Sequence, residues 1–509
     1  MKSNSIWLIL LLAVVAIIVV AFVASSISGL KREFKSYTQR AGTVNYFPRF
    51  CSKRAIICYI VTLLLVSAIF MNRVMPFQFM LFGIVGVLVF FVYSNRLTSS
   101  WWRLDQDRFV KKVFYTALWI RVVYVVFIYF YYIEMTGIPN AYHAGDELLY
   151  QEIAGNWYLY GFDTFLNQIK AHIAFSDRGY CWWLGIEYRL LSDHVLPARL
   201  IKCVIGAYSC VLMYNLAKRN FGEATGRMTA IFYMLMPNAW YYCGVTLKEI
   251  EMAFLTILFV ERADYMLHSK QIKLSGLLVP AMCILLMFTF RTALGAVMFA
   301  ALAAALIFST SKQLEPWKKV LYSMAFVVWM FATVGVEIVQ ETEELWTNKA
   351  TNQSVGYEWR ANRSNGNEFA KYASASVFAP FIFTLPFSSM VKTPDQENQM
   401  MMNGGNFIKN IMSGLTIFAL FAMLLSGDWR KHVLPIALTC GYLVVLVFSN
   451  FAHSERFHFP ILAFELMFAA YGTTLLQNKH KRWIVIWLVA MGIANIGWAW
   501  VKLAGRGMA

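Results

Sequence analysis

Residues 55–71 read AIICYIVTLLLVSAIFM and residues 76–93 read PFQFMLFGIVGVLVFFVY, and neither run contains a charged side chain. An α-helix rises about 1.5 Å per residue, so about 20 apolar residues cross the ~30 Å hydrocarbon core of a bilayer. Similar apolar runs recur along nearly the whole chain. They predict an all-α, polytopic transmembrane helix bundle, since the short alternating segments of a membrane barrel are not seen in the sequence.

The composition agrees with a membrane setting. Of 509 residues, 59% are hydrophobic and 14% are charged, whereas a soluble chain carries roughly a quarter charged residues. The formal net charge of +17 would suit a nucleic-acid ligand, but the Lys and Arg residues concentrate in short loops between the apolar runs. Such loops stay cytoplasmic under the positive-inside rule, so we expect no nucleic-acid partner.

Alternation of the apolar runs with the basic loops predicts about 14 spans. Both termini then lie outside the cytoplasm. The predicted spans lie near residues 6–24, 55–71, 76–93, 113–133, 198–216, 228–246, 250–267, 274–290, 293–309, 320–337, 406–426, 433–451, 457–476 and 483–502.

Two long segments of the predicted topology face outward. In the loop 134–197, the amphipathic stretch 147–160 predicts a helix in the membrane interface. The second outward segment covers residues 338–405. Its apolar stretch 376–390 is predicted to dip into the bilayer. The predicted parts of the chain are three leading spans with basic loops (1–112), a core that includes the outward loop 134–197 (113–337), an extracytoplasmic loop region (338–405) and C-terminal spans (406–509).

The unusual polar clusters of the chain all fall at the outward ends of predicted spans. An acid, several cations and a histidine gathered at one membrane face make a candidate site. The clusters are Gly145-Asp146-Glu147, Lys248-Glu249, Phe290-Arg291-Thr292 and His453-Ser454-Glu455-Arg456.

Asp146 and Glu147 are the candidate catalytic residues. Adjacent carboxylates on a loop are often solvated surface, but the flanking sequence here is aromatic and apolar. Partial burial near the bilayer would tune a carboxylate toward general-base work. A transporter would more often place its acids within a span, near the middle of the membrane.

Lys248, Glu249 and Arg291 are candidate substrate-binding residues. Lys248 either contacts a phosphate, with Glu249 holding a partner in place, or forms an ion pair that snorkels to the interface. Arg291 lies between two apolar runs and must reach the headgroup layer or bind an anion.

The segment around His453, Glu455 and Arg456 is the third candidate region for substrate binding. Its arginine suits a phosphate clamp, and a solvated loop is the alternative interpretation. Metal binding by His453 and His458 is disfavoured, because residues five apart lie poorly on one helical face. We therefore predict no metal site from this spacing.

With these residues in view, the chain resembles the GT-C superfamily of integral-membrane glycosyltransferases. The likeness is to the family-39-like group that contains protein O-mannosyltransferases and the lipid A aminoarabinose transferase. It spans about residues 113–476, although the three leading spans and Lys248 depart from the group's pattern. The motifs that carry it are Asp146-Glu147 with Tyr150 and Ala154-Gly155-Asn156-Trp157, then Pro237, Tyr242 and Lys248-Glu249, and finally Glu455-Arg456-Phe457-His458-Phe459-Pro460.

The resemblance implies transfer of a sugar from a polyprenyl-phosphate donor to a lipid, glycan or protein acceptor at the extracytoplasmic face. Asp146 would be the general base, and Lys248, Arg291 and Arg456 would neutralise the leaving phosphate. This chemistry requires no cofactor, because arginine and lysine can neutralise the leaving group. A divalent metal that does the same is the alternative. A bacterial inner membrane is the expected location. Rival hypotheses are a polysaccharide polymerase or ligase that joins lipid-linked glycans, and a transporter or flippase.

Overall fold

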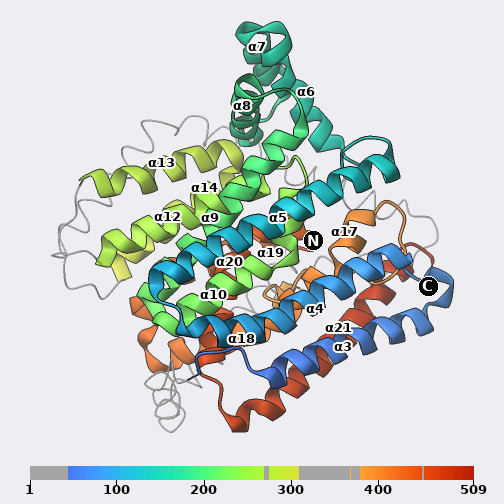
Figure 1. Ribbon diagram of the computed structural model, residues 1–509, viewed down its shortest axis with the longest axis vertical. Coiled ribbons are helices and arrows are strands. Elements are labelled where there is room, and N and C mark those ends of the chain that lie inside the picture. The colour runs from blue at the N-terminus through green and yellow to red at the C-terminus, as the bar shows by residue number, and fades with distance from the viewer. Residues whose placement is uncertain are drawn as a thin grey trace, which may run out of the picture.

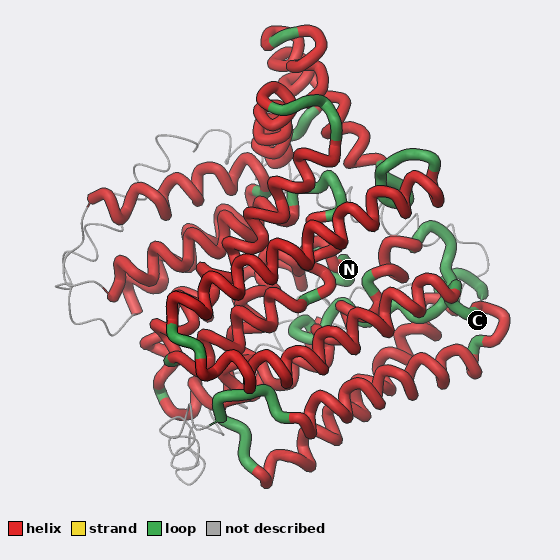
Figure 2. The backbone as a smooth tube through the Cα atoms, in the orientation of Figure 1, coloured by secondary structure: helices red, strands yellow, loops and turns green. Residues whose placement is uncertain are grey.

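The computed structural model describes residues 44–268, 274–308, 367, 369, 379–449 and 452–508. The regular elements in these ranges are helices, which confirms the predicted all-α bundle (Figures 1 and 2). The predicted spans 6–24 and 320–337 lie outside the described residues. Within the described ranges, six helices are long and apolar enough to cross a membrane. They are α3 (Arg49–Ile69), α4 (Phe77–Ser100), α5 (Gln106–Thr136), α9 (Val195–Phe221), α18 (Asn403–Ser426) and α21 (Lys481–Ala504).

Further predicted spans correspond to shorter helices. These agree with the predicted boundaries to within a few residues, because each apolar run ends at a polar or basic loop. The protein is therefore a multi-pass membrane protein. The helices are α12 (Glu249–His268), α13 (Leu274–Phe290), α14 (Thr292–Phe308), α19 (Val433–Phe448) and α20 (Glu455–Thr474).

The prediction of one continuous span over residues 228–246 is wrong. Helix α10 (Glu223–Leu235) ends before Met236, whose backbone is extended, and Pro237 then opens the short helix α11 (Pro237–Cys243). Proline has no N–H group to continue a helix and is well suited to the first helical position. The break therefore divides the predicted span into α10 and α11, and the loop that carries Lys248 follows α11.

The outward loop forms helices α6 (Gly145–Tyr160), α7 (Phe162–His172) and α8 (Phe175–Leu190). The helix predicted over 147–160 is thus confirmed as α6. Together these helices project beyond the rest of the bundle, at the top of Figure 1. Their shared core is aromatic. The centre of the Phe165 ring lies 4.9 Å from the ring centre of Trp157 and 5.1 Å from that of Trp182. Helix α8 also packs against α13, which connects the projection to the bundle.

Helix α20 lies in the middle of the bundle, with almost every residue buried. It packs against α18, α10 and α12, and α18 in turn packs against α4. At that contact a Cβ atom on Gly404 would lie 2.5 Å from the Gly83 carbonyl oxygen, so small residues allow the two backbones to approach closely. Helix α3 packs against α21. The leading helices are therefore built directly into the bundle.

A non-helical segment is buried between α18 and α21. Lys409 of α18 donates to the Leu385 carbonyl, and Asn410 Nδ2 donates to the Pro386 carbonyl at 2.9 Å. The Ser388 N–H donates to Asn495 Oδ1 of α21 at 2.7 Å. Irregular backbone within a membrane protein must be satisfied in this way by protein groups. The described part of the stretch predicted to dip into the bilayer therefore has polar partners from two spans.

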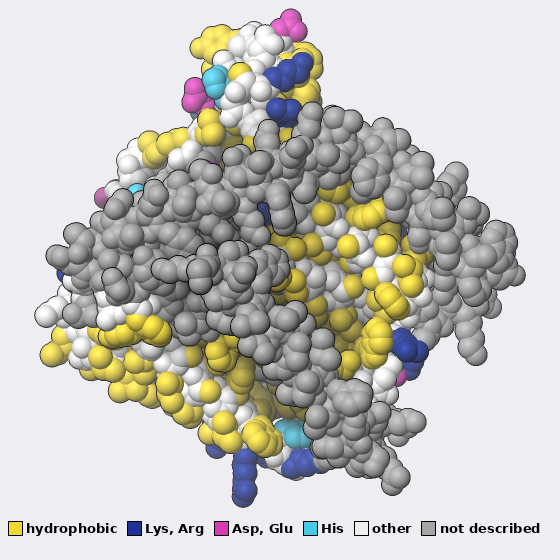
Figure 3. All heavy atoms as spheres, turned by 180° about the vertical axis from the view of Figure 1, so that it is seen from behind, with side chains coloured by type: hydrophobic (Ala, Val, Ile, Leu, Met, Phe, Trp, Pro, Cys, Tyr) yellow, Lys and Arg dark blue, Asp and Glu magenta, His cyan; other side chains and the backbone are white. Residues whose placement is uncertain are grey.

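The outer surface of the bundle suits a bilayer. Large apolar side chains such as Leu64, Trp119 and Phe130 are exposed on the long helices. On the face seen in Figure 3, the side chains left visible by the grey atoms are mostly apolar, and Lys and Arg gather at the lower edge. Exposed apolar patches of this extent indicate contact with lipid.

Candidate active site

Three segments that are far apart in the sequence meet at Arg456, in the first turn of α20. Its Nη1 donates to Asp146 Oδ2, from the first turn of α6, and its Nε donates to Glu249 Oε1, from the first turn of α12. The Glu249 side chain is fully buried, that of Arg456 is 23% exposed, and that of Asp146 is 58% exposed. We call Asp146, Glu249 and Arg456 the carboxylate–arginine cluster; it runs from the core to the surface.

Glu147 points away from this cluster. It pairs with Arg199 of α9 at 3.3 Å and accepts the Thr246 N–H at 2.8 Å, and both charged side chains are almost fully buried. Neighbouring residues on a helix lie about 100° apart, so Asp146 and Glu147 face different surroundings. Glu147 thereby joins α6 to α9 and to the loop before Lys248.

Lys248 uses its three N–H donors within the protein. It donates to the Ser176 carbonyl at 2.9 Å, to Asp177 and to the Phe290 carbonyl. Burial lowers the pKa of Lys248 to about 8; Asp177 opposes this effect, and the positive charge of Arg291 adds to it. Lys248 therefore joins α8 and the end of α13 to the loop before α12.

Asp177 was not identified from the sequence, whereas Tyr150 was noted there as part of the motif that follows Asp146-Glu147. The Tyr150 hydroxyl donates to Asp177 Oδ1 at 3.0 Å, next to Lys248. Asp177 is one of several acids in the outward loop, and its spacing gives no signal that it lies beside the motif of Asp146. Only the packing of α6 against α8 brings these residues together.

Arg291 lies in the turn between α13 and α14 and is partly exposed. Its guanidinium lies 4.0 Å from the centre of the Phe457 ring and donates to the Tyr442 hydroxyl at 3.4 Å. Phe457 directly follows Arg456, and the charge of Arg291 also acts on Lys248. Arg291 thus adds a cation near the carboxylate–arginine cluster.

His453 and Glu455 contact other parts of the bundle. The His453 ring stacks on Trp498 of α21 with centres 4.8 Å apart, and the buried Glu455 accepts from Asn406 Nδ2 at 3.1 Å. His458 is buried and lies 2.8 Å from Lys409 Nζ. Across the described ranges, no group of three or more His, Cys, Asp and Glu side chains is placed to hold a metal ion.

Two further buried ion pairs, which the sequence did not predict, join helices of the bundle. Lys202 of α9 lies 3.4 Å from Glu251 of α12, and Lys409 of α18 lies 3.4 Å from Glu465 of α20. Each partner lies on a different helix, so sequence spacing carries no signal of the pairing. Buried charges of this kind need a partner.

The fold and the cluster define a polytopic membrane protein with charged groups gathered at one end. Residues 179–336 match the family model described as dolichyl-phosphate-mannose-protein mannosyltransferase. This match covers about a third of the chain, and over that range the chain is similar to a family of glycosyltransferases. The matched range includes Lys248, Glu249 and Arg291, whereas Asp146 and Arg456 lie outside it. No curated protein and no solved structure matches the chain.

Proposed function

We propose that the protein transfers a sugar from a polyprenyl-phosphate donor to an acceptor hydroxyl or amine at the extracytoplasmic face, with Asp146 as the general base. The observation that carries the proposal is the contact of Asp146, Glu249 and Arg456 across three distant segments. An exposed carboxylate beside a mostly buried guanidinium offers both a proton acceptor and an orienting charge.

Asp146 suits the role of base because only one of its oxygens contacts Arg456. Oδ2 accepts from the guanidinium, and the side chain as a whole is 58% exposed, so Oδ1 is open to an acceptor. The acceptor would give its proton to Oδ1 as its oxygen or nitrogen attacks the anomeric carbon. A correctly placed general base contributes typically 10²–10⁴-fold to the rate.

The donor phosphate would leave with the bonding electron pair, and the anomeric configuration would be inverted. Arg291 is the cation best placed to meet this growing negative charge, since it is partly exposed and its polar contact is a long one to Tyr442. Cations fixed before the reaction stabilise such charge without reorganisation. Lys248, Glu249, Glu147 and Arg456 would hold these groups in position.

The face of the membrane follows in this proposal from the distribution of charge. Basic residues such as Lys111, Lys218 and Lys431 belong to the end of the bundle opposite Asp146, and basic ends stay cytoplasmic. The site would then face the periplasm or exterior of a bacterial inner membrane.

Transfer of radiolabelled sugar tests this proposal. Purified wild-type protein and Asp146→Asn are given radiolabelled polyprenyl-phosphate sugars and membrane extract as the acceptor source. We expect the substituted protein to lose transfer about 10²–10⁴-fold. Asp163→Asn is the matched control, because Asp163 is an exposed acid on α7 of the same outward loop. If Asp146→Asn and Asp163→Asn transfer label as fast as wild type, Asp146 is not the base.

A further inference from the structure

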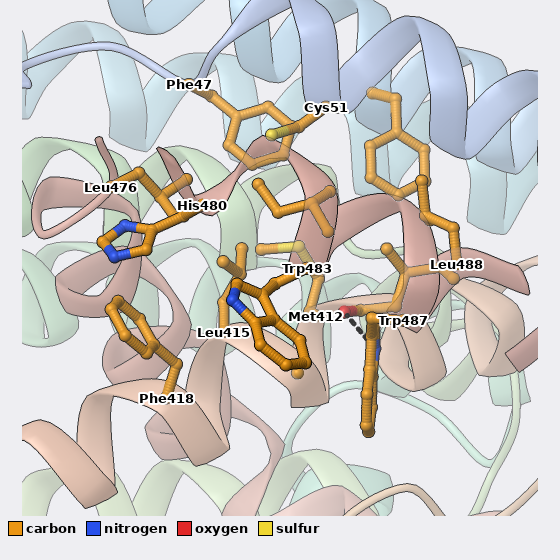
Figure 4. A pocket seen from close by; sticks show the side chains of 14 residues that line it. Phe47, Cys51, Met412, Leu415, Phe418, Leu476, His480, Trp483, Trp487 and Leu488 are labelled. Atoms are coloured by element: carbon orange, nitrogen blue, oxygen red, sulfur yellow. Dashed lines mark hydrogen bonds between the residues drawn. The ribbon is translucent and has the colours of Figure 1, made fainter. Parts of the chain in front are cut away.

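An apolar cavity of about 210 Å³ lies at the other end of the bundle from Asp146. Figure 4 shows its lining, to which α3 contributes Cys51, α18 contributes Leu415 and Phe418, and α21 contributes Trp483 and Trp487. The lining runs along α21 from the turn at residue 480 to residue 488, about 12 Å at 1.5 Å per residue. The cavity therefore extends beside about two turns of a membrane-spanning helix.

The surroundings of the cavity select an apolar occupant. Apolar cavities of roughly 150 Å³ stay dry and take up apolar ligands, and empty space costs contacts in an otherwise close-packed interior. Trp483 lines the cavity and is also among the most exposed apolar side chains of α21. The cavity thus borders the surface that faces hydrocarbon, where lipid tails are the abundant apolar groups.

Two cations lie over one aromatic ring next to the lining residues of the cavity. Arg54 lies 3.9 Å from the centre of the Phe50 ring, and Lys481 lies 5.6 Å from the centre of the same ring. Phe50 precedes the lining residue Cys51, and Lys481 follows the lining residue His480. Two exposed cations therefore share one aromatic ring beside the apolar lining, as expected of a site for an anionic headgroup.

We propose that this cavity binds one acyl chain of an anionic glycerophospholipid of the adjacent leaflet, with the phosphate at Arg54 and Lys481. The apolar lining accepts any lipid tail of suitable length, so the headgroup charge provides the selectivity. The site is separate from the sugar-transfer site and does not depend on the reaction proposed there.

Photo-crosslinking in nanodiscs tests the site. The full chain is reconstituted with phosphatidylglycerol that carries a diazirine at the end of one acyl chain, and the labelled peptides are identified by mass spectrometry. We expect label on residues 411–418 and 483–488. Excess unlabelled phosphatidylglycerol should reduce it at least fivefold, whereas excess phosphatidylcholine should not.

Charge variants separate the site from general lipid contact. Arg54→Gln with Lys481→Gln should reduce labelling of the lining at least fivefold, and Arg54→Lys with Lys481→Arg should retain it. Arg108→Gln with Lys111→Gln is the matched control, because these exposed cations belong to the same end of the bundle on α5. Charge-conserving variants also show whether the protein folds when these positions are changed.

Three results would overturn the proposal. Equal competition by phosphatidylcholine would show that the cavity does not select anionic lipid. Unchanged labelling of the Arg54→Gln, Lys481→Gln protein would remove these cations from the site. Labelling of the lining only after deletion of residues 1–43 would show that a segment of the chain itself occupies the cavity.

Discussion

Arg456 allows a quantitative test of the carboxylate–arginine cluster. Replacement by glutamine removes the charge that faces both Asp146 and Glu249. Glu249 is then left as a buried carboxylate without its cation, and Asp146 loses the group that orients it. We expect a large loss of transfer per folded molecule and, because a buried carboxylate is left unpaired, a less stable protein.

The magnitude follows from the burial of the two contacts. A hydrogen bond to a charged group contributes about 1.5–3 kcal/mol, and the fully buried Glu249 justifies a value near the middle of that range. The contact with Asp146 is discounted to below about 1 kcal/mol, because this carboxylate is 58% exposed and solvent screens it. Together they give about 3 kcal/mol, or about a 100-fold loss in kcat/KM.

The assay compares kcat/KM for sugar transfer by wild type, Arg456→Gln, Arg456→Lys and the double variant with Glu249→Gln. Lysine keeps the charge but not the forked geometry, so its loss should be smaller. Because the two residues act as a pair, the double variant should be no worse than Arg456→Gln alone. Arg189→Gln, an exposed arginine of α8, is the control. Activity of Arg456→Gln within threefold of wild type, or losses that multiply in the double variant, would show that Arg456 and Glu249 do not act as a pair in transfer.

Three further predictions concern the groups around this cluster. Glu147→Gln leaves Arg199 buried without its anion, so it should destabilise the protein by about 3–5 kcal/mol, measured by thermal unfolding in detergent. The ammonium of Lys248 loses its proton as the pH rises through about 8, which weakens its contact with Asp177. Transfer by wild type should therefore fall above this pH, whereas Lys248→Arg stays charged and should not show the decline. In Gly405→Ala the added methyl would overlap the Asn238 side chain, and the yield of folded protein should fall.

Each of these predictions has a matched control. Glu152→Gln changes an exposed acid of the same helix as Glu147 and should leave the unfolding temperature unchanged. Gly497→Ala adds a methyl that meets no other atom within 4 Å beyond its own helix backbone and chain neighbours, and it should leave the yield intact. A decline above pH 8 that persists in Lys248→Arg would show that another group titrates. Unfolding of Glu147→Gln at the wild-type temperature would mean that the pair with Arg199 adds little stability.

The helices could be predicted because their cause is local. For apolar runs of about 20 residues that end at polar or basic loops, the predicted spans and the observed helices have nearly the same bounds. Helices α12, α13 and α14 are examples. The span over 228–246 failed although its signal was also local: Pro237 was present in the sequence, and hydropathy alone ignores it. The helix break could therefore have been predicted from Pro237, whereas the direction of the chain after the break could not be predicted from the sequence.

Hydrophobicity and backbone hydrogen bonding in lipid act on each segment separately, so the amino-acid sequence was enough to predict a polytopic helical membrane protein. It also identified Asp146, Glu249 and Arg456 as candidates, since charged residues beside apolar runs are costly and conspicuous. The packing of the helices brings these three residues together, turns Glu147 toward Arg199 and places Asp177 beside Lys248. Those contacts join different helices, and their geometry depends on how the helices pack, which no single segment encodes.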